Sequence, residues 1–274
     1  MVLDGGEVRV DVRSVYSMLP HEETISSHVE RIASEIKKEG IQRDPIIIDA
    51  ESGAVLDGMH RLAAFSKLGL ENAVCCPVDY SSKTVGLHRW ARAYSHGTQG
   101  DVGQTLMDAG VNRMTTLSEA FAMLDERKCG LIALSSRGVF MPTNPTDLKG
   151  AFAVIRGLDA IALESGWKRE FLPEDEIDSA LQSEEIVVVL IRRLGKDDVV
   201  AAARSGRLFP CKTSMHSIEP RPVAVNLPID KLGSMTGSEL RRELPSSGGK
   251  LLPKGSYYQG RRYKERLLVL NPLD

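Results

Sequence analysis

A turn between a short strand and a helix, within residues 53–65, constrains the fold of this 274-residue chain more than any other stretch. An apolar run typical of a strand ends at Asp57 and Gly58, and a helical pattern begins at once with His60 and Arg61 in its first turn. Glycine lets the backbone approach a ligand closely, and the first amides of a helix have no intrahelical acceptor. The turn therefore predicts an anion site, with phosphate as the most obvious ligand.

An ordinary strand-to-helix turn is the alternative interpretation, in which Arg61 is a solvated cation. Helix starts favour acidic residues, because cations there oppose the helix dipole. His60 and Arg61 in the first turn therefore indicate an anion that offsets their charge. His60 also fits a buried core histidine, and the turn alone gives the two interpretations about equal weight.

The composition, with 42% hydrophobic and 26% charged residues, is ordinary for a globular protein and predicts two small domains. The net charge of -2 gives no general reason to bind nucleic acid, which leaves only a local patch for that function. No apolar run reaches the length of a membrane span, and the amino terminus lacks the pattern of a signal peptide. We therefore expect no membrane partner.

The four cysteines show no metal-ligand spacing and imply no zinc; they are Cys75, Cys76, Cys129 and Cys211. Vicinal cysteines do not easily bridge each other, so a reduced, cytoplasmic protein is favoured. The cysteines also have no partner arrangement for nucleophilic catalysis and are interpreted as structural.

The hydrophobic pattern predicts a mixed α/β protein with three parts: a first domain over 1–95, a second α/β domain over 96–235, and a basic extension over 236–274. The boundary is placed at the polar run 96–101. The expected elements of the first domain are a strand at 8–15, a helix capped by Thr24 or a nearby serine and ended by Gly40, a hairpin from 45 to 56, a helix that begins at the turn 57–61 and is ended by Gly69, a strand at 74–79 and a helix at 81–94.

The expected second domain contains helices at 102–109 and 116–127, a hairpin at 131–141, a helix at 147–164, a strand at 185–192 and a helix at 196–204. The extension is rich in lysine and arginine, and a glycine- and serine-rich run lies at 245–249. With Tyr257, Tyr258 and Tyr263 as stacking surfaces, it resembles a contact for nucleic acid or an acidic partner. A solvated, partly flexible extension is the preferred interpretation.

Four motifs in order carry a resemblance to a known family. They are Pro20-His21-Glu22, Asp57-Gly58-Met59-His60-Arg61, Asp79-Tyr80 followed by Trp90, and Lys212-Thr213-Ser214-Met215-His216. The chain resembles the ParB and sulfiredoxin superfamily and, within it, the free L-serine kinases best known from archaea. The resemblance covers roughly residues 8–232. It departs from the family at Met59, where the family has histidine, and at Met215, where the family has arginine.

The resemblance implies a ParB/sulfiredoxin-like nucleotide-binding domain and an enzyme that transfers a phosphoryl group from ADP or ATP to the hydroxyl of free L-serine. The product, O-phospho-L-serine, would feed cysteine and serine metabolism. Such chemistry needs a group that orients or deprotonates the hydroxyl, and Glu22 is carried over as this catalytic residue. The alternative for Glu22 is a charge that complements the following helix start.

Asp57 stands at the end of the strand, where its carboxylate is suited to a magnesium ion against the phosphates or to a helix cap. The nucleotide phosphates would lie on Asp57 and on the turn formed by Gly58, Met59, His60 and Arg61. The family match places the amino-acid substrate on Glu22, Trp90, Lys212, Thr213, Ser214 and His216. Without that match, Trp90 reads as a core aromatic residue and the Lys212 segment as an exposed loop.

A ParB-like nucleotide-binding regulator, which would bind DNA or protein through the basic extension, is the alternative function. Glu22, the second domain and the absence of a helix-turn-helix pattern favour the enzyme and make a nucleic-acid partner the less favoured one. A sulfiredoxin activity is less favoured still, because Met59 stands where that chemistry needs a cysteine. No motif distinguishes ADP from ATP, serine from another alcohol, or one oligomeric state from another.

Overall fold

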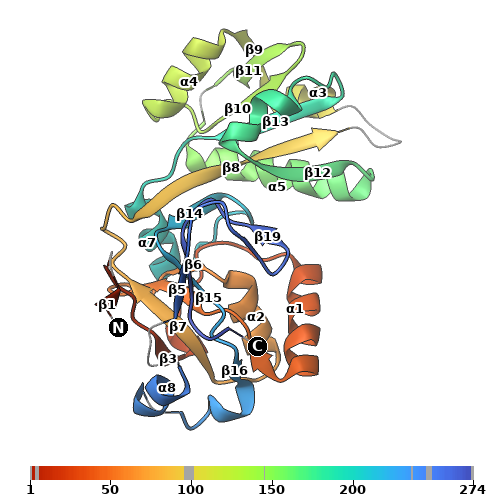
Figure 1. Cartoon of the computed structure of the whole chain (residues 1–274). Coiled ribbons are helices and arrows are strands. Elements are labelled where there is room, and N and C mark those ends of the chain that lie inside the picture. Colours follow the sequence, from red (N-terminus) through yellow and green to blue (C-terminus); the bar gives the residue numbers. More distant parts are fainter. Residues whose placement is uncertain are drawn as a thin grey trace. The chain divides into compact units, whose positions relative to one another are not determined.

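The computed structural model describes residues 2–3, 6–95, 102–144, 146–235, 237–244 and 249–272 (Figure 1). The chain divides into two compact units. The first comprises residues 1–87, 196–211 and 216–274, and the second comprises residues 88–195 and 212–215. Each unit combines a β-sheet with helices, which confirms the α/β fold class. These units differ from the expected ranges, because the chain returns to the first unit after residue 195, whereas the expected boundary at 96–101 lies outside the described residues.

A four-stranded sheet forms the centre of the first unit, in the order β3-β7-β5-β6. Its strands are β3 (Asp11–Ser14), β5 (Ile46–Asp49), β6 (Val55–Asp57) and β7 (Asn72–Val78). β5 pairs in parallel with β7 and antiparallel with β6. All four residues of β5 are buried, as expected for a central strand covered on both faces. The expected hairpin from 45 to 56 is therefore confirmed, and β3 is shorter than the expected strand at 8–15.

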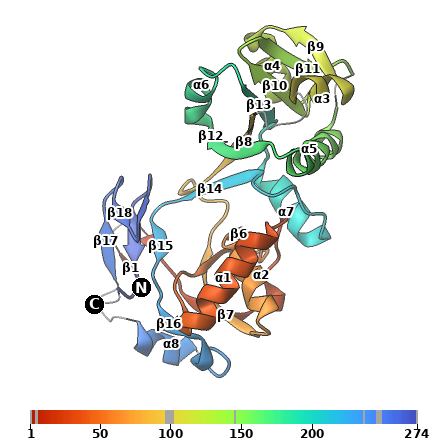
Figure 2. The same cartoon turned by 90° about the vertical axis from the view of Figure 1, so that its right-hand side faces the viewer.

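Two helices, α1 (Ser26–Glu39) and α2 (Met59–Lys67), lie side by side next to this sheet (Figure 2). They bury their apolar stripes, Val29, Ala33 and Ile36 from α1 and Leu62, Ala64 and Phe65 from α2. α1 ends at Gly40, which has a φ of 69° and so occupies the left-handed region expected of a helix terminator. The expected cap at Thr24 is wrong, because Ile25 precedes the helix and no side chain caps it.

The carboxyl-terminal part of the chain also belongs to the first unit. Its strands β17 (Lys250–Leu252) and β20 (Leu267–Val269) form a three-stranded sheet with β15 (Arg221–Val223), and β18 (Tyr257–Tyr258) forms a hairpin with β19 (Arg261–Arg262). The remaining elements of the unit are β1 (Val2–Leu3), β2 (Gly6–Glu7), β4 (Ile41–Gln42), α7 (Lys196–Ser205), β14 (Ser214–Ile218), β16 (Leu227–Pro228) and α8 (Gly237–Glu243), of which β14 begins in the second unit.

The expectation of a solvated, partly flexible extension is wrong for residues 267–270, which are buried. Leu267, Leu268 and Leu270 are buried, and β20 pairs in parallel with β15 and antiparallel with β17. The lysines and arginines that precede these residues in the sequence make the segment look solvated, although a short apolar strand follows them. The glycine- and serine-rich run at 245–249 lies outside the described residues except for Gly249.

A second sheet, in the order β12-β8-β13-β10-β11-β9 with β14 also paired to β8, forms the core of the second unit. Its own strands are β8 (Val85–Ser95), β9 (Val111–Thr115), β10 (Leu131–Ser135), β11 (Gly138–Pro142), β12 (Lys168–Pro173) and β13 (Ile186–Ile191). Its helices are α3 (Val102–Asp108), α4 (Leu117–Asp125), α5 (Leu148–Glu164) and α6 (Ile177–Ala180). These confirm the expected hairpin at 131–141 and the expected helices and strand at 102–109, 116–127, 147–164 and 185–192.

Helices cover both faces of this second sheet (Figure 1). Ala120 and Leu124 of α4 and Ile177 of α6 pack with Ala91 and Ala93 of β8 on one face. The side chains that alternate with these alanines, Arg92 and Tyr94, contact Asp159 of α5. Both faces of β8 are therefore buried.

The expected helix at 81–94 is wrong, because most of this stretch lies in the strand β8. β8 pairs antiparallel with both β12 and β13. Its arginines are buried through ion pairs, whereas a local pattern suggests a solvated helix face. Among the described residues, no helix has the combined length and apolar character that crossing a membrane requires.

Candidate active site

The expected strand-Asp-Gly-helix turn is present, with β6 ending at Asp57 and α2 beginning at Met59. Gly58 between them has a φ of 97°, a left-handed conformation that favours glycine. A Cβ atom on Gly58 would lie 2.8 Å from Nη2 of Arg61. No side chain caps α2, so the start of this helix presents backbone amides without an intrahelical acceptor. The missing side chain at Gly58 therefore makes room for the Arg61 guanidinium at the turn.

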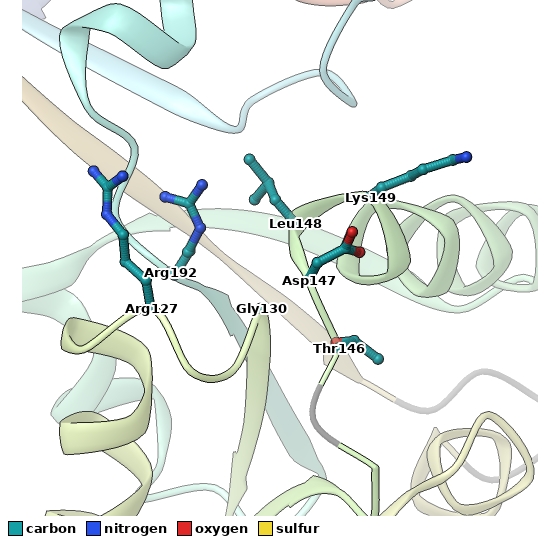
Figure 3. A pocket seen from close by; sticks show the side chains of 7 residues that line it. All are labelled: Arg127, Gly130, Thr146, Asp147, Leu148, Lys149 and Arg192. Carbon is teal, nitrogen blue, oxygen red and sulfur yellow. The ribbon is translucent and has the colours of Figure 1, made fainter.

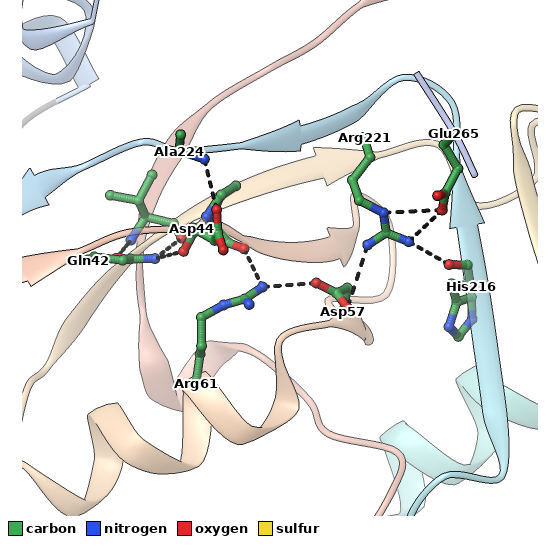
Figure 4. A network of polar contacts seen from close by, with 10 residues as sticks. Gln42, Asp44, Asp57, Arg61, His216, Arg221, Ala224 and Glu265 are labelled. Atoms are coloured by element: carbon green, nitrogen blue, oxygen red, sulfur yellow. Dashed lines mark hydrogen bonds and ion pairs between the residues drawn. The ribbon is translucent and has the colours of Figure 1, made fainter. Parts of the chain in front are cut away.

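Asp57 is held by two arginines from different segments (Figure 4). Nη2 of Arg61 donates to Oδ2 of Asp57 at 2.9 Å and to the carbonyl oxygen of Pro45 at 2.8 Å. Nη1 of Arg221 lies 3.6 Å from Oδ1 of Asp57, and Nη2 of Arg221 donates to Glu265 at 2.9 Å. The anion that offsets Arg61 is thus partly Asp57 itself, which the sequence interpretation did not foresee.

The charge state of Asp57 follows from these contacts. Burial by itself would raise the pKa of the carboxyl group, but Arg221 and Arg61 hold that pKa well below its usual range. The Asp57 side chain is still 40% exposed, so it remains accessible to a ligand. The Nε atom of Arg61 is buried, and no described residue accepts its hydrogen bond. The turn therefore combines an ionised, accessible carboxylate with a guanidinium that retains donor capacity.

His60 has a structural contact in this turn. Its Nε2 atom accepts a hydrogen bond of 3.0 Å from the backbone N–H of Ile25, immediately before α1. An accepting ring nitrogen carries no proton, so this contact requires the neutral imidazole. The His60 ring thus ties the start of α1 to the start of α2.

Glu22 and Met59 line one cavity of about 230 Å³ in the first unit. Apolar side chains form most of its wall, among them Val15, Met18 and Leu62. Glu22 is only 4% exposed, and its segment is fixed because the N–H of Glu23 donates to the carbonyl oxygen of Phe209. The fold therefore brings the expected catalytic carboxylate to the same cavity as one residue of the expected phosphate turn, Met59, although 37 positions separate the two residues in the sequence. Asp57, Gly58, His60 and Arg61 are not among the residues that line this cavity.

His216 lies in a buried polar cluster of the first unit. Its Nε2 atom is 2.8 Å from the hydroxyl oxygen of Tyr80, and its ring packs edge-on against His21 at a centroid distance of 5.6 Å. Burial lowers the pKa of His21 to about 4 and that of His216 to about 3. The carbonyl oxygen of His216 also accepts a hydrogen bond from Arg221. His216 is therefore neutral and linked through Arg221 to Asp57.

The other expected substrate residues gather in the second unit. Nζ of Lys212 lies 5.2 Å from the centre of the Trp90 ring, a cation–π contact, and the N–H of Trp90 faces the carbonyl oxygen of Thr213 at 3.5 Å. Lys212 has a φ of 55°, which is uncommon for a residue with a side chain. Thr213 and Ser214 are buried, so the interpretation of this segment as an exposed loop is wrong.

The described residues contain no cluster of three or more histidine, cysteine, aspartate or glutamate side chains able to hold a metal ion. Magnesium usually binds one or two carboxylates together with substrate phosphates. Asp57 fits that pattern as a single carboxylate, because it is ionised and partly exposed. A magnesium ion at this turn would therefore depend on the phosphates for its other ligands.

A larger cavity, of about 320 Å³, lies in the second unit and contains none of the expected site residues (Figure 3). It is lined by Arg127, Gly130, Thr146, Asp147, Leu148, Lys149 and Arg192. Asp147 caps α5 by accepting a hydrogen bond from the N–H of Gly150. The side chains of Arg127 and Arg192 extend in the same direction.

Several residues around the turn have no motif that could have revealed them. Arg221 and Glu265 are distant in sequence from Asp57, and Tyr80 was part of a motif without an assigned role. The only sequence signal for Glu265 is a carboxylate among basic residues. The positions of Arg221 and Glu265 depend on the pairing of β15 with β20, which no local pattern predicts.

Comparisons with known proteins agree with this fold and turn. The chain shares its α/β fold with a solved free serine kinase in complex with AMP, which superposes with a TM-score of 0.70 at 22% identity and covers 82% of this chain and 94% of that one. A ParB-like protein of Sulfolobus acidocaldarius is 37% identical over 73 residues, 27% of this chain and 36% of that protein. The expected fold is confirmed.

Two relatives match most of the chain in sequence, and both are L-serine kinases. An ATP-dependent L-serine kinase of Staphylothermus marinus is 24% identical over 230 residues, 80% of this chain and 89% of that protein. The ADP-dependent L-serine kinase of Thermococcus kodakarensis is 23% identical over 221 residues, 78% of this chain and 89% of that protein. No family model matches the chain. The resemblance to free L-serine kinases that the motifs indicated is therefore confirmed.

Proposed function

We propose that this protein is a phosphotransferase that moves a phosphoryl group from ADP or ATP to the hydroxyl of free L-serine and forms O-phospho-L-serine. The observation that carries the proposal is the cavity shared by Glu22 and Met59, which joins a buried carboxylate to the phosphate turn. The similarity to both ATP-dependent and ADP-dependent L-serine kinases supports the same activity. The four free cysteines support a reducing compartment such as the cytoplasm.

The nucleotide phosphates lie, in this proposal, on the backbone amides that begin α2 and on the Arg61 guanidinium. A helix start without a side-chain cap suits an anion, since its amides point outward and its dipole favours negative charge. Arg61 adds charged donors to the same anion. Asp57 would hold the magnesium ion that accompanies a nucleotide, and the ion would supply neutralisation of the phosphate charge.

Glu22 acts on the acceptor. Its carboxylate takes the proton of the serine hydroxyl, the serine oxygen forms the new bond to the terminal phosphorus, and the bond from that phosphorus to the bridging oxygen breaks, which releases AMP from ADP or ADP from ATP. The apolar walls around Glu22 exclude water, which would otherwise compete as an acceptor. Trp90, Lys212, Thr213 and Ser214 are the proposed contacts of the amino acid, with Lys212 on its carboxylate.

His216 has a different proposed role. Since it is buried and bonded to Tyr80, it supports the turn through Arg221 instead of donating charge to the substrate. His60 likewise acts through its backbone amide, because its ring already bonds Ile25.

The test is incubation of the purified protein with magnesium, L-serine and either ADP or ATP, followed by phosphorus NMR for O-phosphoserine. We expect product with at least one donor. Glu22→Gln keeps the shape and removes the base, so the turnover rate falls about 100- to 1,000-fold while nucleotide affinity stays within about twofold. Glu23→Gln, the adjacent carboxylate, is the matched control and keeps most of the activity.

A ParB-like regulator remains the second candidate, favoured by the short match to a ParB-like protein. Phosphoserine formation and DNA binding, measured on the same purified protein, distinguish the two functions. Absence of phosphoserine with both donors, together with salt-sensitive DNA binding that depends on the basic residues after 236, would overturn the kinase and support the regulator.

A further inference from the structure

The carboxyl-terminal segment brings a third arginine toward the phosphate turn. Arg261 lies on β19, in the hairpin with β18, and its guanidinium lies over the Tyr263 ring at 4.7 Å from the centroid. Tyr263 is 9% exposed and packs with Val223 and Ala224, directly after Arg221 along β15. The hairpin is therefore anchored to the strand that holds Arg221.

Arg61 and Arg221 pair with Asp57, and Arg261 is the third cation of this region. It lies over Tyr263, two residues before Glu265, which is the carboxylate that pairs with Arg221. The three come from α2, β15 and β19, three segments far apart in sequence. Among the described residues, ion pairs join Asp57 and Glu265 to Arg61 and Arg221, and none is found for Arg261, so the Arg261 charge is available to an anion.

Arg261 is the exposed member of the three. No described residue offers it a carboxylate partner, and its one described side-chain contact is the stack on Tyr263. Stacking fixes the plane of a guanidinium while its edge keeps N–H donors available for a phosphate. Gln259 and Gly260, with φ values of 48° and 77°, form a tight left-handed turn that sets the register of the hairpin.

We propose that Arg261 is a further nucleotide-binding residue, which contacts the phosphate chain of the nucleotide held at the Asp57–Arg61 turn and thereby makes the β18–β19 hairpin part of that site. This inference rests on the proposed nucleotide site, not on the identity of the acceptor. It gives the basic carboxyl-terminal segment a role in binding a nucleoside di- or triphosphate.

The chain supplies a matched control in Arg262. The two arginines are neighbours in β19, so their side chains point to opposite faces of the hairpin. Arg261 pairs across the hairpin with Tyr258 and Arg262 with Tyr257, whose side chain is 73% exposed. Replacing either one removes the same charge from the protein, but only Arg261 lies over the buried Tyr263.

The experiment is calorimetric titration of ADP and ATP, with magnesium, into the wild-type chain and into Arg261→Ala, Arg261→Lys and Arg262→Ala. We expect Arg261→Ala to weaken binding about tenfold, the size of a lost charge-assisted hydrogen bond, and Arg262→Ala to change it less than twofold. Arg261→Lys recovers part of the loss, because the charge stays while the planar stack is lost. Thermal unfolding of each variant checks that the exposed substitutions leave the fold intact.

Equal weakening by Arg261→Ala and Arg262→Ala would overturn the inference in favour of a general charge effect, and unchanged affinity in Arg261→Ala would overturn it outright. The phosphoserine assay on the wild-type chain separates the two proposals. Nucleotide binding that depends on Arg261 without phosphoserine formation would support this inference and reject the kinase, whereas phosphoserine formation with unchanged affinity in Arg261→Ala would do the reverse.

Discussion

Both units bury arginines, but the acids that hold them differ in exposure. In the first unit, Arg221 is 8% exposed and pairs with Glu265, which is 16% exposed, and with Asp57, which is 40% exposed. In the second unit, Arg92 is 1% exposed and pairs with Asp159, which is 15% exposed and also bonds Arg169 and Tyr94. The charges around Asp159 are closed off within the protein, whereas Asp57 keeps an accessible face.

The comparison shows why a buried arginine does not by itself indicate a site. A buried ion pair contributes little net stability, but breaking it leaves a costly unpaired charge. The pair on Asp159 stabilises the packing of α5 against β8. The pairs on Asp57 instead fix an ionised carboxylate beside a helix start that has no side-chain cap. Four experiments test this difference, beginning with the largest effect.

Replacing each acid by its amide tests the comparison directly. We expect Asp57→Asn to lower the rate of phosphoserine formation about 100-fold, because the variant loses the proposed contact to the magnesium ion. Its affinity for nucleotide without magnesium does not fall, since a negative charge near the phosphates has been removed. The measurements are steady-state kinetics and calorimetry with and without magnesium.

Asp159→Asn is the counterpart, and we expect it to lower the free energy of unfolding by about 3 kcal/mol, because Arg92 loses its charged partner in a buried position. Urea unfolding measures this loss, and activity per folded molecule stays near that of the wild type. Loss of activity in Asp159→Asn without loss of stability would contradict the purely structural role of the ion pairs on Asp159.

The dependence of stability on pH provides the second test. Burial lowers the pKa of His21 to about 4 and of His216 to about 3, below the value near 6.5 of an unfolded histidine. A depressed histidine pKa means that the unfolded chain takes up protons first, so the free energy of unfolding is constant above pH 6.5 and falls as the pH drops from 6.5 toward 4. The pKa of Asp57 is also depressed, so this residue lowers the free energy of unfolding only below about pH 4.

Urea unfolding between pH 7.5 and about 4.5 measures how much of the free energy of unfolding is lost as the pH falls. We expect His21→Gln to reduce this loss by removing one of the two titrating groups, although the variant is less stable at neutral pH. A wild-type profile that stays flat down to pH 4.5 would contradict the burial of neutral histidines in the first unit.

Glycine replacements give the third test. Gly58→Ala places a Cβ atom 2.8 Å from Arg61 in a left-handed conformation, so we expect a loss of about 2–3 kcal/mol in the free energy of unfolding together with weaker nucleotide binding. Gly40 has the same left-handed backbone conformation, but a Cβ atom there would have no heavy atom within 4 Å. We therefore expect Gly40→Ala to lower the free energy of unfolding by about 1 kcal/mol and to leave nucleotide affinity unchanged. Equal effects of the two on nucleotide affinity would remove the special role of Gly58.

The smallest expected effect belongs to a single hydrogen bond in the second unit. Tyr94→Phe removes the 2.7 Å bond from the Tyr94 hydroxyl to Asp159 and keeps the ring, so we expect a loss of about 1 kcal/mol in stability. Activity and nucleotide affinity stay at the wild-type level. A large change in either one would show that the cluster around Asp159 also serves the reaction.

Much of the fold could be predicted from local patterns. The helix that ends at Gly40, the hairpin of β10 and β11, and α5 with its Asp147 cap all follow from periodicity and turn chemistry within a few residues. The strand β8 could not, because its arginines resemble a solvated helix face until β12 and β13 pair with it. The carboxyl-terminal strand β20 could not be predicted either, because it is short, follows a run of basic residues and depends on pairing with β15 and β17.

By itself, the sequence determined the turn at 57–61, since an Asp-Gly pair between a short apolar strand and an amphipathic helix has few other conformations. It also determined the order of the motifs that mark the resemblance to serine kinases. The tertiary structure alone sets which groups meet around the turn: Arg221, which reaches Asp57, pairs with Glu265, 44 positions away, and the neutral His60 ring accepts a hydrogen bond from the backbone N–H of Ile25, 35 positions away. Local propensities act over a few neighbouring residues, whereas these contacts depend on the path of the whole chain.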